Sequence, residues 1–355
     1  MSFSNMLKAV LFLLSIPTVL SHPSPQHETW TALASITVAP RQEHTAFFLQ
    51  PSTIGILGGV VPNGTWFATT DLMQFYSIRD DSWRTATLIP KPLNHVNAVT
   101  SRGKLYVLGG LADTPEGNWA AIPDAWVYNQ RKNSWTAIAP MPVGEARGSA
   151  AVGVYKNLII LAGGITLLNV TGDGSEITVD TVSIFDTSAG KWVEVPEAAK
   201  TIPEGRDHAG AAVVGDKMYI LGGRKEGKEH VQDTVFILDI CDMAAGWTIS
   251  SARMPTARGG LSTGVIENKI YTFGGEGNQN LESGVFNETE VYDPIKDSWE
   301  RLGSMEVPRH GTSAVAVGDA VYIPGGGIRA GGGPVSTFDV FRPGAKHPCK
   351  ERTRQ

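Results

Sequence analysis

The sequence is poor in long apolar segments, in clustered positive charge and in cysteine. Its one notable apolar stretch, Ala9–Leu20, has 12 residues and is too short to cross a bilayer, so we expect no membrane span. Lysine and arginine form no run and the formal net charge is −5, which argues against a nucleic-acid partner. The only cysteines, Cys241 and Cys349, allow one disulfide bond or two free thiols, and the sequence leaves both open.

The N-terminus has the pattern of an export signal. Lys8 precedes the apolar stretch, and the small residues Val19 and Ser21 suit cleavage after Ser21. We therefore expect residues 1–21 to be a signal peptide and the mature chain to be secreted or to enter the secretory pathway. A disulfide bond is compatible with that route. So are three glycosylation sequons, at Asn63, Asn169 and Asn287.

Glycine is abundant, at 40 of 355 positions, and much of it falls into a repeat. Short apolar runs such as KLYVLGG and KIYTFGG end on a Gly-Gly pair, which predicts a strand that stops at a tight turn. Six such pairs recur at intervals of 51 to 59 residues, and five tryptophans recur in phase at intervals of 52 to 57. This double period is typical of a repeat architecture. The first glycines are Gly58, Gly109, Gly163, Gly222, Gly274 and Gly325, and the tryptophans are Trp83, Trp135, Trp192, Trp247 and Trp299.

A repeat of about 50 residues with Gly-Gly, then an aromatic-acidic strand, then tryptophan resembles the kelch family. The resemblance implies an all-β, six-bladed β-propeller over residues 22–345, in which each repeat forms a four-stranded blade. The sixth blade lacks a tryptophan strand of its own. Glu28–Ala32, which contains Trp30, supplies it, so the N-terminal strand closes the ring and leaves no open sheet edge. Residues 346–355 form a polar tail.

In a propeller the first strand of each blade lines the central channel, so the residues at its start indicate a site. Counting back sixteen and fourteen residues from each first glycine gives two positions per blade on one face. These positions ring the expected channel mouth with arginines and histidines: Arg147, Arg206, Arg258, Arg309, His44, His95 and His208, with Glu43, Asn94, Asp207 and His310 between them. Arginine here is also part of the kelch pattern, and it can instead hydrogen-bond loop carbonyls of the next blade.

Large apolar side chains are expected over this mouth. Trp66 and Trp119 lie in the segments that follow the Gly-Gly pairs, and these segments emerge at the same end of the propeller. An aromatic wall above a few polar groups is the usual form of a small-molecule site. The same side chains would also suit a protein-binding patch, or could simply pack the loops against one another.

The motifs indicate no cofactor and no metal. Copper oxidases that share the propeller need a cysteine cross-linked to tyrosine and a pair of histidines, and neither cysteine falls near the mouth. The iron triad of kelch-type plant specifier proteins, Glu-x3-Asp-x3-His, is matched by Glu176 and Asp180 but has Ile184 in place of histidine. The glycine-rich stretch 325–333 is interpreted as a flexible mouth loop.

Two groups of enzymes are similar to this chain in size, export signal and repeat: bacterial sialic acid mutarotases, and fungal secreted hetero-Diels–Alderases of tropolone-sesquiterpenoid pathways. The second resemblance implies a cofactor-independent pericyclase that holds an apolar terpene and a planar quinone methide face to face. Its catalytic hydrogen-bond donors would be Arg147, Arg206, His208, Arg258 and Arg309, and its substrate-binding residues would be His44, His95, Trp66, Trp119, Asp207 and His310. The alternatives are an extracellular module that binds carbohydrate or protein, and a sugar mutarotase or epimerase.

Overall fold

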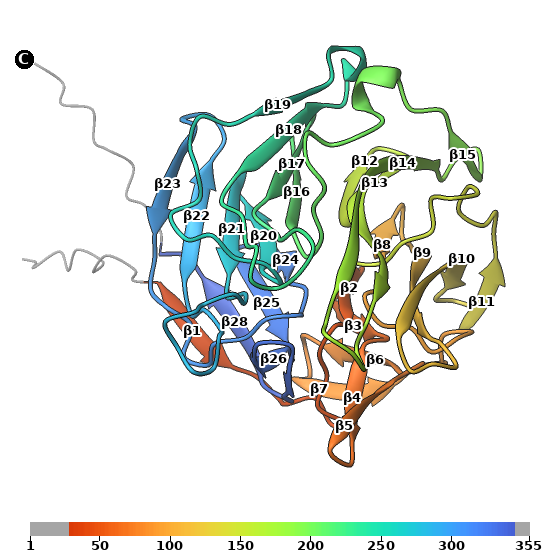
Figure 1. Cartoon of the computed structure of the whole chain (residues 1–355). Coiled ribbons are helices and arrows are strands. Elements are labelled where there is room, and N and C mark those ends of the chain that lie inside the picture. Colours follow the sequence, from red (N-terminus) through yellow and green to blue (C-terminus); the bar gives the residue numbers. More distant parts are fainter. Residues whose placement is uncertain (1–27, 345–355) are drawn as a thin grey trace, which may run out of the picture. The chain divides into compact units, whose positions relative to one another are not determined.

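The computed structural model describes residues 28–344, so the expected signal peptide, the polar tail and Cys349 lie outside the described residues. Glu28–Pro343 form one compact unit. Its strands make six antiparallel blades of four strands around an axis (Figure 1), which confirms the kelch propeller predicted from the repeat. Two short 3-10 helices, η1 (Glu197–Ala199) and η2 (Met243–Ala245), lie in connections. No helix in this part of the chain is long and apolar enough to cross a membrane.

Each blade runs from an inner strand, which contacts the inner strands of its neighbours, to an outer strand. Blade 1 contains β2 (Thr45–Leu49), β3 (Thr53–Leu57), β6 (Met73–Ser77) and β7 (Ser82–Thr85). Blade 2 contains β8 (Ala98–Ser101), β9 (Lys104–Asp113), β10 (Trp119–Asn129) and β11 (Ser134–Ala137). Blade 3 contains β12 (Ala151–Tyr155), β13 (Leu158–Leu168), β14 (Glu176–Asp186) and β15 (Lys191–Val193).

The second half of the ring repeats this order. Blade 4 contains β16 (Gly210–Val214), β17 (Lys217–Leu221), β18 (Val235–Asp239) and β19 (Trp247–Ile249). Blade 5 contains β20 (Ser262–Ile266), β21 (Lys269–Phe273), β22 (Thr289–Asp293) and β23 (Ser298–Arg301). Blade 6 contains β24 (Val315–Val317), β25 (Ala320–Pro324), β28 (Phe338–Arg342) and, from the other end of the unit, β1 (Thr29–Ala32).

The ring closes through β1, as the sequence predicts. β1 pairs antiparallel with β28, with Thr29 opposite Arg342 and Ala32 opposite Asp339. Trp30 packs its ring against Phe341 at a centroid distance of 5.0 Å, and its indole N–H donates to the Gly303 carbonyl of the preceding blade. β1 is the outermost strand of blade 6, so this pairing gives the last blade its fourth strand and covers the outer edge of β28.

The hydrophobic core lies between successive blades. Phe47 and Leu57 of blade 1, for example, pack in one cluster with Leu105 and Tyr128 of blade 2. Burying each such side chain contributes about 1.5–3 kcal/mol. The outer tryptophans cover these seams: Trp83 packs on Tyr76 at 5.3 Å and donates to the Ala34 carbonyl. The tryptophans therefore recur in the sequence because each blade needs one to pack along its outer edge.

The Gly-Gly pairs do not end every strand. In blades 2 and 3 the second strand continues through Gly109-Gly110 and Gly163-Gly164, so β9, β10, β13 and β14 extend beyond the blade body. Trp119 of β10 pairs with Leu168 of β13, which joins the two blades. Blades 1 and 6 instead carry small hairpins, β4 (Val60–Asn63) with β5 (Trp66–Thr69) and β26 (Gly327–Arg329) with β27 (Gly332–Pro334).

Candidate functional site

Each blade has one residue with a positive φ angle just before its inner strand, and the six residues together surround the axis. These residues are Glu43, His95, Ser149, His208, Gly260 and Gly311, with φ between 49° and 63°. A closed ring of hydrogen bonds links them. Each backbone N–H donates to the carbonyl of the preceding member, except that His208 N–H donates to the Ser149 hydroxyl. Their side chains therefore start from a common, fixed level of the channel. We call these six residues the axial ring.

Blade 1 departs by one residue from the register predicted for it. Its β2–β3 turn has three residues, Gln50 to Ser52, whereas the corresponding turn in each other blade has two. Arg41 and Glu43 therefore occupy the positions that the count assigned to Gln42 and His44. His44 is buried beside Thr312, and burial lowers its pKa to about 3. It faces a small cavity on the other side of the axial ring.

A larger cavity of about 590 Å³ opens on the side where the segments after the Gly-Gly pairs emerge. Its apolar lining is Trp66, Phe67, Trp119, Leu168 and Val170, and polar residues of the loop 226–230 also line it. Trp66 is 50% exposed, whereas Trp119 is 8% exposed and packs against the His95 ring at 5.6 Å. The structure thus places both predicted tryptophans and both histidines, His95 and His208, in one cavity.

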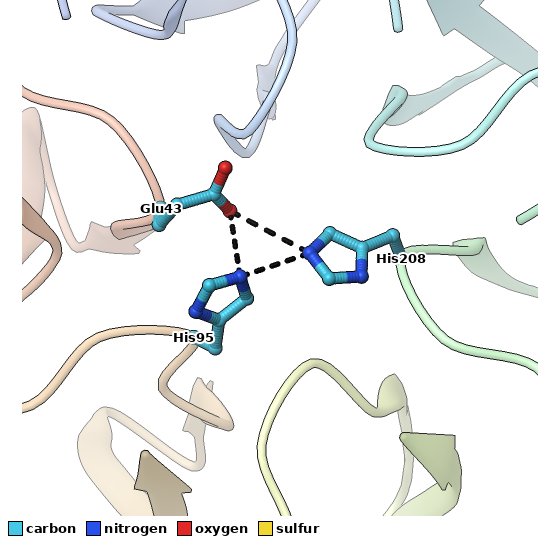
Figure 2. A group of neighbouring side chains, drawn as sticks. All are labelled: Glu43, His95 and His208. Carbon is cyan, nitrogen blue, oxygen red and sulfur yellow. Dashed lines mark hydrogen bonds and ion pairs between the residues drawn. The ribbon is translucent and has the colours of Figure 1, made fainter. Parts of the chain in front are cut away.

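Three axial-ring side chains meet on the cavity floor, as Figure 2 shows. The Nε2 atoms of His95 and His208 are 2.9 Å apart, and Glu43 Oε2 lies 3.1 Å from the first and 3.8 Å from the second. Burial alone would raise the pKa of Glu43, but attraction to His95, His208 and His310 outweighs it and holds that pKa well below its usual value. Gly311 gives the carboxylate room, since a Cβ there would lie 2.3 Å from Glu43 Oε1.

Two neighbouring side chains orient the imidazoles. His95 Nδ1 is 2.6 Å from Asn94 Oδ1, and His208 Nδ1 is 2.6 Å from Asp207 Oδ1. Burial raises the pKa of Asp207, but its bond with His208 and the charge of Arg224 outweigh burial and bring it to about 2. The predicted residue Asp207 is therefore a partner of the floor, and it does not line the cavity.

Arg224 is the cation of the floor. It forms ion pairs with Glu176 Oε1 at 2.9 Å, with Asp207 Oδ1 at 3.0 Å and with Glu276 Oε1. These three carboxylates outweigh burial and raise the pKa of Arg224. Since one guanidinium is shared among them, burial prevails at Glu176 and raises its pKa to about 8. The Oε2 atom of Glu176 has no hydrogen-bond partner in the described structure.

His310 lies behind this floor and is fully buried. Its Nε2 donates to the Arg329 carbonyl at 2.7 Å, which leaves Nδ1 3.4 Å from Glu276 Oε2 and 3.8 Å from Glu43 Oε1. His310 thus contacts the floor residues without lining the larger cavity.

The four predicted arginines do not ring the mouth. They are at most 2% exposed, and each points into its own blade, not to the next one. Arg147 donates to the Gly163 and Leu161 carbonyls, and Arg309 pairs with Asp339 at 2.7 Å. Arg206 donates to Thr234, and Arg258 pairs with Glu290 at 2.6 Å. Each arginine side chain points into its own blade. Its guanidinium therefore ties the segment before the inner strand to the rest of the sheet and does not reach the cavity.

The count back from Gly-Gly missed Arg224, Glu276 and Glu176. The residue directly after each Gly-Gly pair forms a bridge with the start of the inner strand, as Arg224 does with Asp207 and Glu276 with Gly259. In blades 1 to 3 that residue is apolar and fully buried: Val60, Leu111 and Ile165. A charged residue at this position in blades 4 and 5 was the available signal.

The predicted modification sites have mixed surroundings. Asn63 and Asn287 are exposed, whereas Asn169 is half-buried and its amide donates to Asp173 Oδ1 at 3.1 Å. Cys241 is an exposed free thiol within the described residues, and its predicted partner lies outside them. Glycosylation and disulfide formation stay predictions.

Comparison with known proteins agrees with the fold. Residues 20–231 match the model of the Attractin/LZTR1 beta-propeller, and residues 170–326 match that of the KLHDC2/KLHL20/DRC7 Kelch-repeats domain. The chain is 36% identical to "Kelch-like protein terF" of Aspergillus terreus over 93% of this chain and 70% of that protein. It is 28% identical to human "Kelch-like protein 34" over 74% of this chain, and it spans only 39% of that protein.

A solved structure shares the architecture at low sequence identity. "Structure of YjhT" superposes with a TM-score of 0.68 and 19% identity, covering 87% of this chain and 96% of that one. The match to the Aspergillus protein spans most of both chains. With the repeat, the six closed blades and the matching family models, it leads to one assignment: the chain belongs to the kelch-repeat β-propeller family.

Proposed function

We propose that this chain is a secreted enzyme that binds an apolar or aromatic small molecule, and that it acts as a hetero-Diels–Alderase in secondary metabolism of the fungal tropolone-sesquiterpenoid type. One observation supports this most directly: a single cavity has an aromatic and aliphatic wall on one side and a buried charged floor on the other. A small molecule with a hydrocarbon part and one polar end matches that division. The similarity to a kelch-like protein of Aspergillus terreus is consistent with a fungal pathway.

The reaction suits this division of the cavity. A quinone methide supplies the C=C–C=O diene, a terpene supplies the alkene, and one C–C and one C–O bond form with no oxidant or proton required. Trp66 and Trp119 would hold the two hydrocarbon faces together, which raises their effective concentration. The diene oxygen would face the floor, where Arg224 lines the cavity and would donate a hydrogen bond to that oxygen.

The experiment measures adduct formation from a quinone methide and an alkene by chiral chromatography and mass spectrometry. We expect one stereoisomer at a rate above the uncatalysed background. Trp66→Ala and Trp119→Ala should each lower the rate at low substrate by about tenfold, which corresponds to about 1.4 kcal/mol of lost contact. Ile295→Ala is the control, because Ile295 is 89% exposed and does not line the cavity.

Two results would overturn this proposal. One is an adduct mixture and rate equal to those in buffer. The other is unchanged catalysis in both tryptophan variants, which would place the reaction outside this cavity. Calorimetric titration with monosaccharides covers the rival function: saturable binding of a free sugar that Trp119→Ala abolishes, together with no adduct, would assign the cavity to carbohydrate.

A further inference from the structure

Two of the three atom separations in the floor triad are close to those of a metal site, and the third is slightly longer. Glu43 Oε2 and the Nε2 atoms of His95 and His208 are separated by 2.9, 3.1 and 3.8 Å. Ligands that bind one ion at about 2.0–2.2 Å lie roughly 3.0–3.5 Å from each other in tetrahedral or octahedral geometry. Figure 2 shows the three side chains pointing at a common point from three separate blades. The backbone ring that carries all three fixes this convergence.

The surroundings select the tautomers that metal ligands need. Asn94 Oδ1 and Asp207 Oδ1 can only accept, so each draws the Nδ1 proton of its histidine. In the neutral imidazoles the Nε2 lone pairs then point at each other and at the Glu43 carboxylate. Three acceptors at such distances repel one another unless a metal ion or a shared proton lies between them. An outer partner on the far ring nitrogen is the usual companion of a metal-bound histidine.

The charges around the triad also call for a cation. Three buried carboxylates, those of Glu176, Asp207 and Glu276, share the single guanidinium of Arg224, and the buried Glu43 carboxylate has histidines as its partners. Two buried side-chain oxygens near them have no hydrogen-bond partner in the described structure, namely Gln42 Oε1 and Glu176 Oε2. Unpaired buried charge is costly, and a dication is the compact way to offset it.

We propose that Glu43, His95 and His208 together bind one divalent first-row transition ion. Two imidazoles and one carboxylate favour Zn²⁺, Fe²⁺, Mn²⁺ or Co²⁺ over Mg²⁺ and Ca²⁺, which prefer oxygen ligands. All three residues line the larger cavity and also the small cavity on the other side of the axial ring, so an ion held by them is open to both. An oxygen of a cavity ligand can therefore reach the ion and be polarised by it. This site does not depend on the reaction proposed above.

One contact must change when the ion binds. The terminal nitrogen of Arg224 lies 3.3 Å from His208 Nε2, where it occupies the lone pair that the metal would use. Arg224 keeps its three carboxylate partners after losing this long bond. The competing occupant of the triad is a proton shared among the three groups, and metal analysis distinguishes the two.

The test uses full-length protein without a histidine tag, treated with a chelator and titrated calorimetrically with Zn²⁺, Mn²⁺, Co²⁺, Mg²⁺ and Ca²⁺. We expect one equivalent of a transition ion to bind, and the Co²⁺ form to show the visible absorption of imidazole-bound cobalt. Glu43→Gln and His208→Asn should weaken binding by 100-fold or more. Asp207→Asn, at a positioning residue, should weaken it by about 10–100-fold.

The matched control is Glu197→Gln, at an exposed position outside both the triad and the larger cavity, which should bind as the wild type does. The proposal is overturned if the wild type takes up no transition ion, if it prefers Mg²⁺ or Ca²⁺, or if folded Glu43→Gln keeps the wild-type affinity. Should a variant fail to fold, a cobalt spectrum of the wild type without imidazole ligation is equally decisive. Metal binding is measured without substrate, so its failure is separate from a failure to form adduct.

Discussion

Replacing Arg258 with methionine should destabilise the propeller while leaving the larger cavity intact. The arginine is fully buried and donates to Glu290 Oε2 at 2.6 Å and to Thr272 Oγ1 at 2.7 Å, both in its own blade. Methionine fills much of the same volume but removes the close cation of the buried Glu290 carboxylate, which keeps only Thr256 Oγ1 at 2.7 Å and the exposed Arg301 at 3.7 Å. Breaking such a buried ion pair costs about 3–5 kcal/mol. At about 2 cal/mol/K of unfolding entropy per residue, a domain of this length would lose roughly 4–8 °C in melting temperature.

Thermal unfolding followed by circular dichroism measures this loss. The control is Arg131→Met at an exposed position, which should stay within about 0.5 kcal/mol of the wild type. Adding Glu290→Leu to Arg258→Met should recover much of the loss, because replacing both members of a buried ion pair is often close to neutral. If Arg258→Met keeps the wild-type melting temperature but loses ligand binding, Arg258 belongs to the binding site and the structural role is refuted.

Three further predictions concern the axis and the blade seams. Gly311→Ala should lower the free energy of unfolding by about 1–3 kcal/mol and weaken ion binding, because its φ is +58° and its Cβ would strike Glu43. The control is Gly318→Ala, at φ +63° with no atom within 4 Å, which should show only the cost of the backbone conformation. Trp30→Ala should lower the denaturant midpoint by an amount equivalent to about 2 kcal/mol, since it removes packing on the closing strand. Asn97→Ala should cost about 3 kcal/mol in chemical unfolding, because it leaves the buried Leu108 and Arg147 carbonyls and the Ala150 N–H without their partner.

The parts of the fold that recur were predictable from the sequence, because each copy confirms the others. The Gly-Gly pairs and tryptophans located the blades, and the missing sixth tryptophan identified β1 as the closing strand. The register of blade 1 was wrong because one extra turn residue before Thr53 shifts everything upstream. A single count back from Gly-Gly cannot detect such an insertion.

The site was predictable only in part, because it depends on which unlike residues meet on the axis. Trp66, Trp119, His95 and His208 were found because they stand out from the repeat. Arginines that belong to the repeat turned out to serve the blades, as Arg147 does. Arg224 was missed because its ion pairs join residues from three blades, and no spacing within one repeat encodes such contacts.

The axial ring carries the side chains of the candidate site on residues that lie outside the strands of the blades. None of its six residues belongs to a strand. Five of the six bonds that close the ring join main chain to main chain, and the sixth runs from His208 N–H to the Ser149 hydroxyl. Exchanging one amino acid per blade could therefore give related chains different ligands while sheets, seams and closure stay unchanged. Gly260 is the place to look first for such divergence, since it adds no side chain to the present triad and, unlike Ser149, supplies no hydroxyl that closes the ring.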